Sequence, residues 1–391
     1  MALAESGCSV NVVCPADHPV TKTHAAERIF DYHGLAPLSS LANAISSVKP
    51  ELIIPGDDLA TQHLHSLHQR GLRRGKAGKA ICQLIERSLG SPESFAIVYG
   101  RTAVMELAGS DGIRVPETKV ISDTDDLRRW TARIGFPFVL KADRTSGGTG
   151  VKIVHTPEEA EAAFRKLHAA PRFRHAIRQA WVAHDTTVFW PSLLRQRRTI
   201  NAQAFIAGRE ATSTVLCWQG GVLASLHFEV LHTAYSSGPA TVVKLIQNTE
   251  MQEAAEKIIG RLNLSGFQGF DFVFDGSTGN PYLIEMNPRV TQAGHLTLGA
   301  GRDIPAALYG TLTGELVRPA PILTDNDTIA YFPQEWLRDP ASSFLKSAYH
   351  DVPWDEPDLV RACVGPRAAP VILDSRRKVI PALSTVGIPP A

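Results

Sequence analysis

The sequence lacks the features that mark several classes of protein. Its five cysteines are scattered over 391 residues without a C-x-x-C pair, which favours a reduced, cytoplasmic protein over a disulfide framework or a zinc site. No apolar run is long enough to cross a bilayer, and the start has neither the charged nor the apolar segment of a signal peptide. The formal net charge of +1 gives no electrostatic reason to expect binding to nucleic acid or to an anionic membrane.

Also absent at the start are the strand and glycine-rich turn with which a nucleotide-binding α/β domain normally begins. Residues 2–7 are typical of the end of a helix, and residues 9–14 are typical of a buried strand. We therefore hypothesise that the chain is truncated or that its start codon is misplaced. A longer reading frame beginning with a strand, a glycine turn and a helix would support this hypothesis, and an in-frame stop directly upstream would contradict it.

A chain of 391 residues is too long for one compact core, so two or three domains are expected. Alternating patterns near the start predict a helix at 38–48 and, within 51–58, a strand that runs into a loop, which is typical of α/β structure with a parallel sheet. Gly56, Asp57 and Asp58 follow the carboxyl end of that strand, where open α/β sheets bind ligands. A plain turn with solvated acids is the alternative.

Further segments near the start have less certain functions. His65 and His68 are three residues apart on a predicted helix and could share a metal-binding face, or the helix could simply be packed or exposed. Residues 70–80 combine basic side chains with glycines, which predicts a solvated loop or a contact with an anionic substrate. Residues 91–116 are expected to form a helix followed by a turn into a strand.

The most informative segment, residues 266–289, predicts two strands joined by a tight turn at 276–280. Because side chains alternate along a strand, the three phenylalanines of the first strand share one face and Asp271 lies on the other. Glu285 and Asn287 share a face of the second strand, and Pro288 ends the pairing. Two carboxylates and an amide can thus converge, and such hard oxygen ligands suit Mg²⁺ on nucleotide phosphates. A surface hairpin with stray charges is the alternative.

A second segment predicts a phosphate-binding loop. A strand at 138–141 delivers Lys141, and a strand returns at 151–154. Glycines let backbone N–H groups approach phosphate oxygens closely, and Lys141 supplies a positive charge. The spacing is not that of a Walker A loop. With the acidic hairpin, this pattern predicts a mobile flap over a triphosphate rather than an ordinary hairpin, and the loop residues assigned to it are Gly147, Gly148, Thr149 and Gly150.

These segments, and above all the run IEMNPRV at residues 284–290, resemble the ATP-grasp superfamily, most of all the carbamoyl phosphate synthetase large chain and its single-module relatives. The resemblance covers roughly residues 90–315. It implies that Asp271, Glu285 and Asn287 hold two Mg²⁺ ions on ATP, with Mn²⁺ as a substitute. It also implies that Arg289 faces the phosphate or the substrate.

The resemblance assigns further contacts with ATP. Arg101 is expected at the phosphates, where relatives usually have a lysine, and an arginine keeps the charge but changes the geometry. Residues 201–210 resemble the adenine hinge, with Glu210 accepting hydrogen bonds from the ribose hydroxyls. A plain β-hairpin is the alternative for this segment. The strand residues whose backbone is expected at the adenine edge are Gln203, Ala204, Phe205 and Ile206.

The implied fold class is α/β and α+β: an ATP-grasp fold with an N-terminal Rossmann-like domain, a glycine-loop lid subdomain and a large antiparallel-sheet subdomain. The expected boundaries are 1–92, 93–317 with the lid at about 115–200, and 318–391 for a C-terminal element. Residues 249–262 predict an amphipathic helix with Thr249 and Gln252 as its capping box. Residues 380–391 are expected to be poorly ordered.

The predicted function is an ADP-forming ligase that converts a carboxylate into an acylphosphate and joins it to an amine, commonly that of an amino acid. Its catalytic groups would be Lys141 and Asn287 at the transferring phosphoryl group and Arg289 at the acylphosphate and the later oxyanion. The expected partners are small molecules, with a homodimer as an open alternative. A second interpretation, favoured by Arg101 and Gln203, is an ATP-binding protein without independent turnover, such as a sensor or a partner-dependent subunit.

Overall fold

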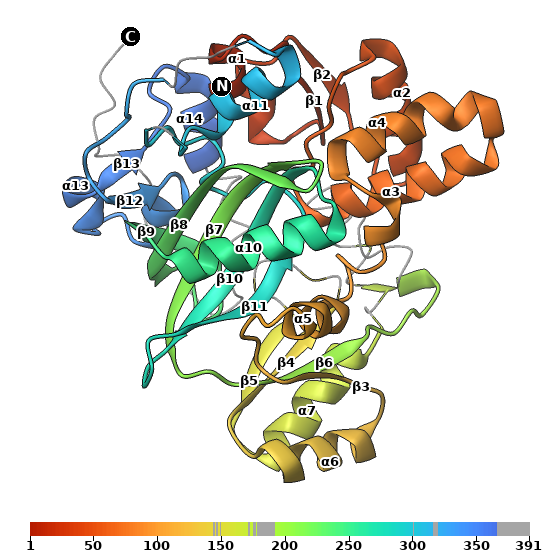
Figure 1. Ribbon diagram of the computed structural model, residues 1–391, viewed down its shortest axis with the longest axis vertical. Helices are drawn as coiled ribbons and strands as arrows, with labels where there is room; N and C mark the ends of the chain where they lie inside the picture. The colour runs from red at the N-terminus through yellow and green to blue at the C-terminus, as the bar shows by residue number, and fades with distance from the viewer. Residues whose placement is uncertain are drawn as a thin grey trace.

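The computed structural model describes residues 1–143, 145, 148, 150–170, 173–174, 177, 192–299, 301–315 and 320–365. Gly147, Thr149 and the segment 380–391, about which the sequence made predictions, lie outside the described residues. The described part contains an N-terminal region, a four-stranded sheet and a seven-stranded sheet (Figure 1). This mixed architecture confirms the predicted fold class. No helix in these ranges is both long enough and apolar enough to cross a membrane.

The N-terminal region contains a two-stranded parallel sheet with helices around it. β1 (Asn11–Cys14) pairs with β2 (Arg28–Asp31), which confirms the parallel α/β pattern. The helices of this region are α1 (Ala2–Glu5), α2 (Pro37–Val48), α3 (Asp58–Arg73) and α4 (Lys79–Leu89), and its 3₁₀ turns are η1 (Pro19–Lys22), η2 (Gly75–Gly78) and η3 (Pro92–Ser94).

The strand predicted at 51–58 is wrong, because this segment is irregular as far as the start of α3. The Ile53 N–H donates to the Ser88 hydroxyl (3.0 Å), and the Pro55 carbonyl accepts from the Val290 N–H (3.2 Å). Leu52 and Ile54 pack against the core of the seven-stranded sheet. The apolar pattern therefore indicated burial correctly, but the backbone has neighbouring loops and side chains as partners instead of a strand.

The basic loop predicted at 70–80 is also wrong for most of its length. Helix α3 continues to Arg73 and α4 begins at Lys79. A Cβ atom on Gly78 would overlap the backbone of Gly71, and one on Gly71 would lie 2.6 Å from the Cys82 sulfur. The glycines are therefore needed for the close approach of two helical segments. Similarly, the helix expected from residue 91 begins only at Arg101.

The histidines of α3 are packed side chains. The His65 ring stacks on Phe95 with ring centroids 3.8 Å apart, and His68 Nε2 lies 2.7 Å from the Glu86 carboxylate. Burial is the main cause of a lowered pKa of about 3 for His65, so this ring is neutral at physiological pH. The packed-helix interpretation therefore fits, and the two rings do not share an open metal-binding face.

The four-stranded sheet is antiparallel, in the order β3-β6-β4-β5. Helices α6 and α7 cover one face (Figure 1), and their apolar side chains form one core with the strands. Thr156 and Glu159 form a capping box at the start of α7. The elements are α5 (Arg101–Ser110), β3 (Thr118–Ile121), α6 (Thr124–Ile134), β4 (Phe138–Ala142), β5 (Val151–Val154), α7 (Pro157–His168) and β6 (Ile200–Ala204).

The seven-stranded sheet has the order β11-β10-β7-β8-β9-β12-β13. β10 pairs antiparallel with β11 on one side and with β7 on the other. The predicted hairpin is therefore confirmed, and because its first strand is internal, the surface-hairpin alternative is excluded. The elements are β7 (Gly208–Trp218), β8 (Gly221–Thr233), β9 (Ala240–Ile246), α10 (Thr249–Leu262), β10 (Gly266–Asp275), β11 (Pro281–Asn287) and α11 (Ile304–Thr313).

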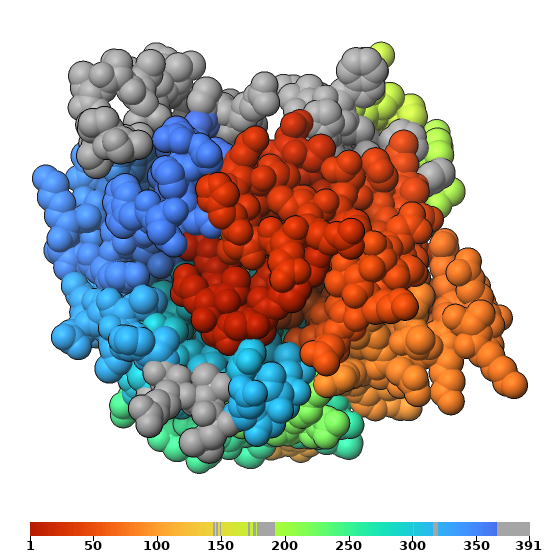
Figure 2. All heavy atoms as spheres, turned by 90° about the horizontal axis from the view of Figure 1, so that it is seen from above, coloured from red at the N-terminus to blue at the C-terminus, as the bar shows by residue number. Residues whose placement is uncertain are grey.

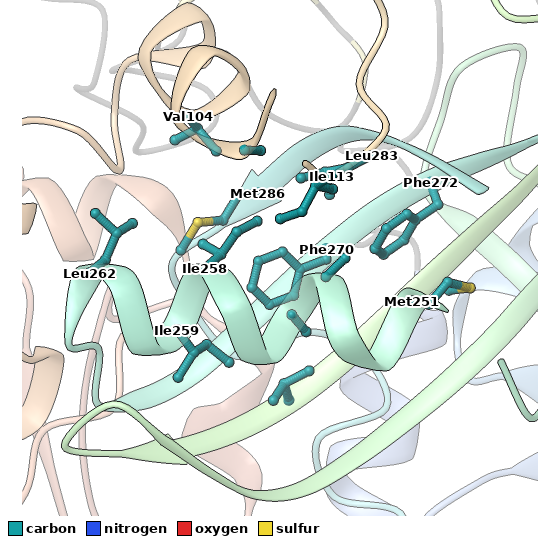
Figure 3. Packing of buried hydrophobic residues seen from close by; sticks show 14 of the residues in the cluster. Val104, Ile113, Met251, Ile258, Ile259, Leu262, Phe270, Phe272, Leu283 and Met286 are labelled. Carbon is teal, nitrogen blue, oxygen red and sulfur yellow. The ribbon is translucent and has the colours of Figure 1, made fainter. Parts of the chain in front are cut away.

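Helix α10 covers one face of this sheet, and α11 packs against the other. Figure 3 shows Ile258 of α10 packed with Phe270 of β10 and Met286 of β11. Phe270 is fully buried, as the alternation of side chains predicted. The cap of α10 is one residue earlier than predicted: the Asn248 side chain, instead of Thr249, accepts from the Met251 N–H (2.9 Å).

The C-terminal residues extend the large sheet. Their elements are β12 (Thr328–Tyr331), α12 (Gln334–Arg338), α13 (Phe344–Ser347), β13 (Tyr349–Asp351) and α14 (Pro357–Val364). β12 pairs with β9 and with β13. Figure 2 shows the two ends of the described chain side by side, and the buried Glu356 carboxylate accepts from the Thr23 hydroxyl (2.8 Å) and the His24 N–H (3.0 Å). The C-terminal segment thus holds the N-terminal region against the sheet.

Candidate functional site

A cleft of about 540 Å³ is lined by strands from both sheets. It brings together residues that are far apart in the sequence and that were predicted as site residues. Those lining the cleft are Arg101, Lys141, Gly148, Gln203, Ala204, Phe205, Ile206, Glu210, Asp271, Glu285, Asn287 and Arg289. Gly150, also predicted as a site residue, does not line the cleft, and a Cβ atom on it would overlap the Thr145 side chain.

The acidic hairpin sets two carboxylates opposite each other. Asp271 of β10 is the register partner of Glu285 of β11. The Asp271 carboxylate accepts from the Thr212 hydroxyl (2.9 Å) and from the Asn287 amide (2.8 Å). Burial raises the pKa of Asp271, and the negative charge of Glu285 raises it further. The ladder thus holds close together two like charges that favour a cation between them.

This donor set fits a divalent cation that is carried on phosphates. Carboxylate and amide oxygens are hard ligands, and Mg²⁺ in nucleotide sites takes one or two carboxylates and completes its shell with phosphates and waters. In the described ranges, no group of three or more His, Cys, Asp or Glu side chains could hold a metal. Asp271, Glu285 and the Asn287 amide therefore match a shared site better than an all-protein cage.

Two cations lie next to Glu285. Arg101 donates from Nη1 to Glu285 Oε2 at 2.8 Å, and Lys141 Nζ is 3.8 Å from the same oxygen. Lys141 also donates to the Ile284 carbonyl (3.1 Å). Burial lowers the pKa of Lys141 to about 8, although the charge of Glu285 opposes this effect. At neutral pH the cleft therefore holds a desolvated ammonium group beside a carboxylate.

Arg101 is held by a network that the sequence analysis missed. Its Nε lies 3.8 Å from the Asp143 carboxylate, which accepts from the Asn201 amide at 2.7 Å. The Asn201 carbonyl oxygen in turn accepts from the Thr102 hydroxyl (2.7 Å). Strand alternation could have identified Asn201, because it shares a face of β6 with the cleft residue Gln203. Asp143 gave no such signal, since it follows the end of β4.

Arg289 connects the hairpin with the N-terminal region. Its Nε donates to the Asp58 carboxylate (3.1 Å), and Nη2 donates to the side-chain amide oxygen Oδ1 of Asn287 (3.2 Å). Burial raises the pKa of Asp58, while Arg289 lowers it. Asp57 instead caps α3 by accepting from the Ala60 N–H (2.7 Å). In the predicted ligand loop, Asp57 is thus a structural cap, and Asp58 is paired with the predicted site residue Arg289.

The segment assigned to the adenine hinge joins the two sheets. β6 belongs to the four-stranded sheet and β7 to the seven-stranded sheet, so the plain-hairpin alternative is excluded. Phe205 and Ile206, predicted as strand, lie in the irregular connection between them. Gln203 is buried and donates to the Thr118 hydroxyl (3.1 Å). Glu210 lies on β7, where burial and the charge of Asp271 raise its pKa.

The glycine loop contacts a second loop whose role the sequence did not reveal. Ser236, Ser237 and Gly238 line the cleft. Gly148 has a φ of +72°, and a Cβ atom on it would overlap the carbonyl oxygen of Ser237. The two loops therefore meet through backbone atoms. This contact depends on the approach of two sheets, so no local pattern could have indicated it.

Comparisons with known proteins identify the family of this chain. A model of the carbamoyl-phosphate synthase L chain, ATP binding domain, matches residues 101–304. The chain is 25% identical over 301 residues to the carbamoyl phosphate synthase arginine-specific large chain of Geobacillus stearothermophilus, covering 74% of this chain and 25% of that protein. It is 24% identical over 299 residues to the Thermus thermophilus large chain, covering 74% and 26%. The chain thus spans about a quarter of the length of these relatives.

Solved structures give the same fold. N5-carboxyaminoimidazole synthetase from Staphylococcus aureus, complexed with ADP, superposes with a TM-score of 0.56 at 16% identity, covering 81% of this chain and 75% of that one. The biotin carboxylase domain of Hydrogenobacter thermophilus 2-oxoglutarate carboxylase, in complex with MgADP, has a TM-score of 0.56 at 17% identity, covering 82% and 67%. The chain therefore has an ATP-grasp fold and belongs to the family of the carbamoyl-phosphate synthase large-chain ATP-binding domain.

Proposed function

We propose that this protein is an ATP-dependent, ADP-forming ligase that activates a carboxylate as an acylphosphate and joins it to an amine. The observation that carries the proposal is the convergence of Lys141 and Arg101 with the Asp271–Glu285 pair in one cleft. Family membership supports ATP as the nucleotide. No nucleophilic side chain is needed, because positioning and electrostatic stabilisation supply most of the catalysis in phosphoryl transfer.

The hairpin residues would hold the metal. In this proposal Asp271, Glu285 and Asn287 bind Mg²⁺, with two ions expected and Mn²⁺ as a substitute. Bound there, the metal would neutralise charge on the transferring phosphoryl group. Lys141, whose ammonium group is buried beside Glu285, would add positive charge on the same side. Phe205, Ile206 and Glu210 would contact the adenosine, because they line the part of the cleft where β6 passes into β7.

The reaction has two displacements. A carboxylate oxygen of the acid attacks the γ-phosphorus, the bond to the bridging oxygen breaks, and ADP leaves with that electron pair. The amine nitrogen then attacks the carbonyl carbon of the acylphosphate, and the tetrahedral oxyanion collapses with loss of phosphate and of the amine proton. Arg289 would stabilise this oxyanion, since its guanidinium lies at the end of β11 next to Asn287.

The test is ADP and phosphate release from Mg-ATP with pooled amino acids and small carboxylates. For the productive acid–amine pair, Glu285→Gln should lower the rate by at least about 100-fold, because it removes a charge that stabilises the metal in the transition state. Glu256→Gln, on the exposed face of α10, is the matched control and should retain activity. Release of AMP and pyrophosphate would mean that the enzyme adenylates its substrate. ATP binding without turnover would favour the sensor or partner-dependent subunit.

The domain boundaries also remain our proposal. We assign residues 1–92 to the N-terminal domain, 93–317 to the ATP-grasp domain with a lid at about 115–200, and 318–391 to a C-terminal element. Because β12 and β13 extend the large sheet, we expect the C-terminal element to unfold together with that sheet.

The 2-oxoglutarate carboxylase domain was crystallised as a dimer, and sedimentation of this chain would test a homodimer.

A further inference from the structure

Arg101 contacts the carboxylate that the proposed function assigns to the metal. All three guanidinium nitrogens face oxygen atoms: Nη1 is 2.8 Å from Glu285, Nη2 is 3.1 Å from the Thr145 carbonyl, and Nε is 3.8 Å from Asp143. The side chain is only 16% exposed. The guanidinium is therefore a fixed and largely desolvated cation in the cleft.

The position of Arg101 in the chain explains why it needs these partners. It is the first residue of α5, and a cation at the amino end of a helix is disfavoured by the helix dipole. Acceptors outside the helix must offset this effect. The chain of hydrogen bonds from Thr102 through Asn201 to Asp143 keeps one acceptor in place, and Glu285 supplies the direct ion pair.

The two acids differ in their direct ion pairs, although Arg289 and Lys141 also act on Asp271 at longer range. Glu285 Oε2 has two cations within 4 Å, Arg101 and Lys141. Across the ladder, the polar contacts of Asp271 in the described part of the chain are with the neutral side chains of Thr212 and Asn287. A divalent cation that bridges the pair would sit close to the guanidinium, and the two positive charges would repel each other strongly in so desolvated a site.

We propose that Arg101 is the resident counter-cation of Glu285, which a divalent metal must displace, and that the nucleotide phosphates are the anions that receive the released guanidinium. The inference rests on the proposed Mg-ATP site. A guanidinium matches carboxylate and phosphate equally well, so the exchange preserves its hydrogen bonds. It follows that the protein alone binds metal weakly, and that metal and nucleotide each strengthen the binding of the other.

The test uses Mn²⁺ as the probe and needs no turnover. Binding of Mn²⁺ to the full nucleotide-free chain is measured by the loss of the free-ion electron paramagnetic resonance signal. Arg101→Gln should bind Mn²⁺ about tenfold more tightly than the wild type, a change within the usual range of coupling between sites. It should bind ADP more weakly in the presence of Mn²⁺. Arg128→Gln removes an arginine of exposed ion pairs on α6 and should change neither affinity.

Several results would overturn the proposal. Equal Mn²⁺ affinities of the wild type and Arg101→Gln would mean that the guanidinium does not compete with the metal. A gain that persists in Arg101→Gln/Glu285→Gln would place the metal elsewhere. Should Arg101→Gln fail to fold, Arg101→Lys keeps the charge with a single contact point and should give an intermediate affinity; an affinity at or below that of wild type would contradict the proposal. Failure of the ligase assay would leave these binding results unaffected, so the two proposals can fail separately.

Discussion

Two antiparallel hairpins supply charged side chains to the same cleft, and they are built very differently. The β10–β11 hairpin has strands of ten and seven residues, and β10 is internal in its sheet. The β4–β5 hairpin has strands of only five and four residues; in both hairpins the second strand lies at the edge of its sheet. The turn of β10–β11 is exposed and supplies no lining residue, although Gly276 bonds to the connection beside the cleft, whereas the turn of β4–β5 includes Gly148 at the cleft wall.

The two hairpins differ because one is proposed to hold metal ligands and the other to bind phosphate. Metal ligands must keep a fixed spacing, and Asp271 and Glu285 obtain it from a long ladder whose first strand also pairs with β7 and carries buried phenylalanines. A phosphate-binding loop must approach its ligand through backbone atoms, and it needs small residues rather than a deep core. We therefore expect mutations behind β10–β11 to affect global stability, and mutations in the β4–β5 turn to affect nucleotide binding.

The largest expected effect is that of Phe270→Ala. This ring is fully buried between α10 and the sheet, so its loss should lower the free energy of unfolding by about 3–5 kcal/mol. Urea denaturation followed by circular dichroism measures the change. Leu35, which is 60% exposed, provides the control: Leu35→Ala should change stability by less than about 0.5 kcal/mol. A loss below about 1 kcal/mol for Phe270→Ala would show that the hairpin is not anchored by its core.

Next in size is the effect of Gly148→Ala on nucleotide affinity. Gly279, in the turn of β10–β11, has the same φ of +72° as Gly148, but a Cβ atom there would meet open space. Both substitutions should cost about 1–2 kcal/mol of stability from the left-handed backbone. Only Gly148→Ala should also push the Ser237 carbonyl away and weaken ADP binding, by about tenfold, which corresponds to about 1.4 kcal/mol. Calorimetry measures the ADP affinity of both variants. Equal affinities would contradict the proposal that only the β4–β5 turn takes part in nucleotide binding.

The same comparison explains how far the sequence could predict the molecule. Alternation along each strand, with the turn between them, was enough to predict that Asp271 and Glu285 converge, since a hairpin is a local structure. The contacts of Arg101 with Asp143 and of Gly148 with Ser237 join separate elements, and no local periodicity encodes them. The strand wrongly predicted at 51–58 has the same origin, because an apolar run reports burial and not the presence of a partner strand. The roles of the site residues in ATP binding remain predictions.

An effect of similar or smaller size is expected from pH. Burial lowers the pKa of Lys141 to about 8, and bound phosphate should raise it by favouring the charged form. Since the nucleotide then prefers the protonated protein, ADP affinity should fall as pH rises from 7 to 9, by up to about tenfold per unit above pH 8. Lys141→Met should bind ADP more weakly with a flat profile over this range. Lys119→Met, which removes a partly exposed ion pair with Asp126, is the control and should keep the pH dependence of ADP affinity. If this pH dependence persists in Lys141→Met, another group causes it.

The smallest effect concerns the helix that backs the metal side. Because the Asn248 side chain caps α10, Asn248→Ala should lower the free energy of unfolding by about 1 kcal/mol. Thr249 follows the cap and makes no capping bond in the described structure, so Thr249→Ala should cost less than about 0.5 kcal/mol. Urea denaturation ranks the two variants. Since Ile258 and Ile259 of α10 pack in the same core as Phe270, fraying at the cap should reach the hairpin only weakly, and ADP affinity should be unchanged in both. A larger loss of stability for Thr249→Ala than for Asn248→Ala would support Thr249 as the cap, as the sequence predicted.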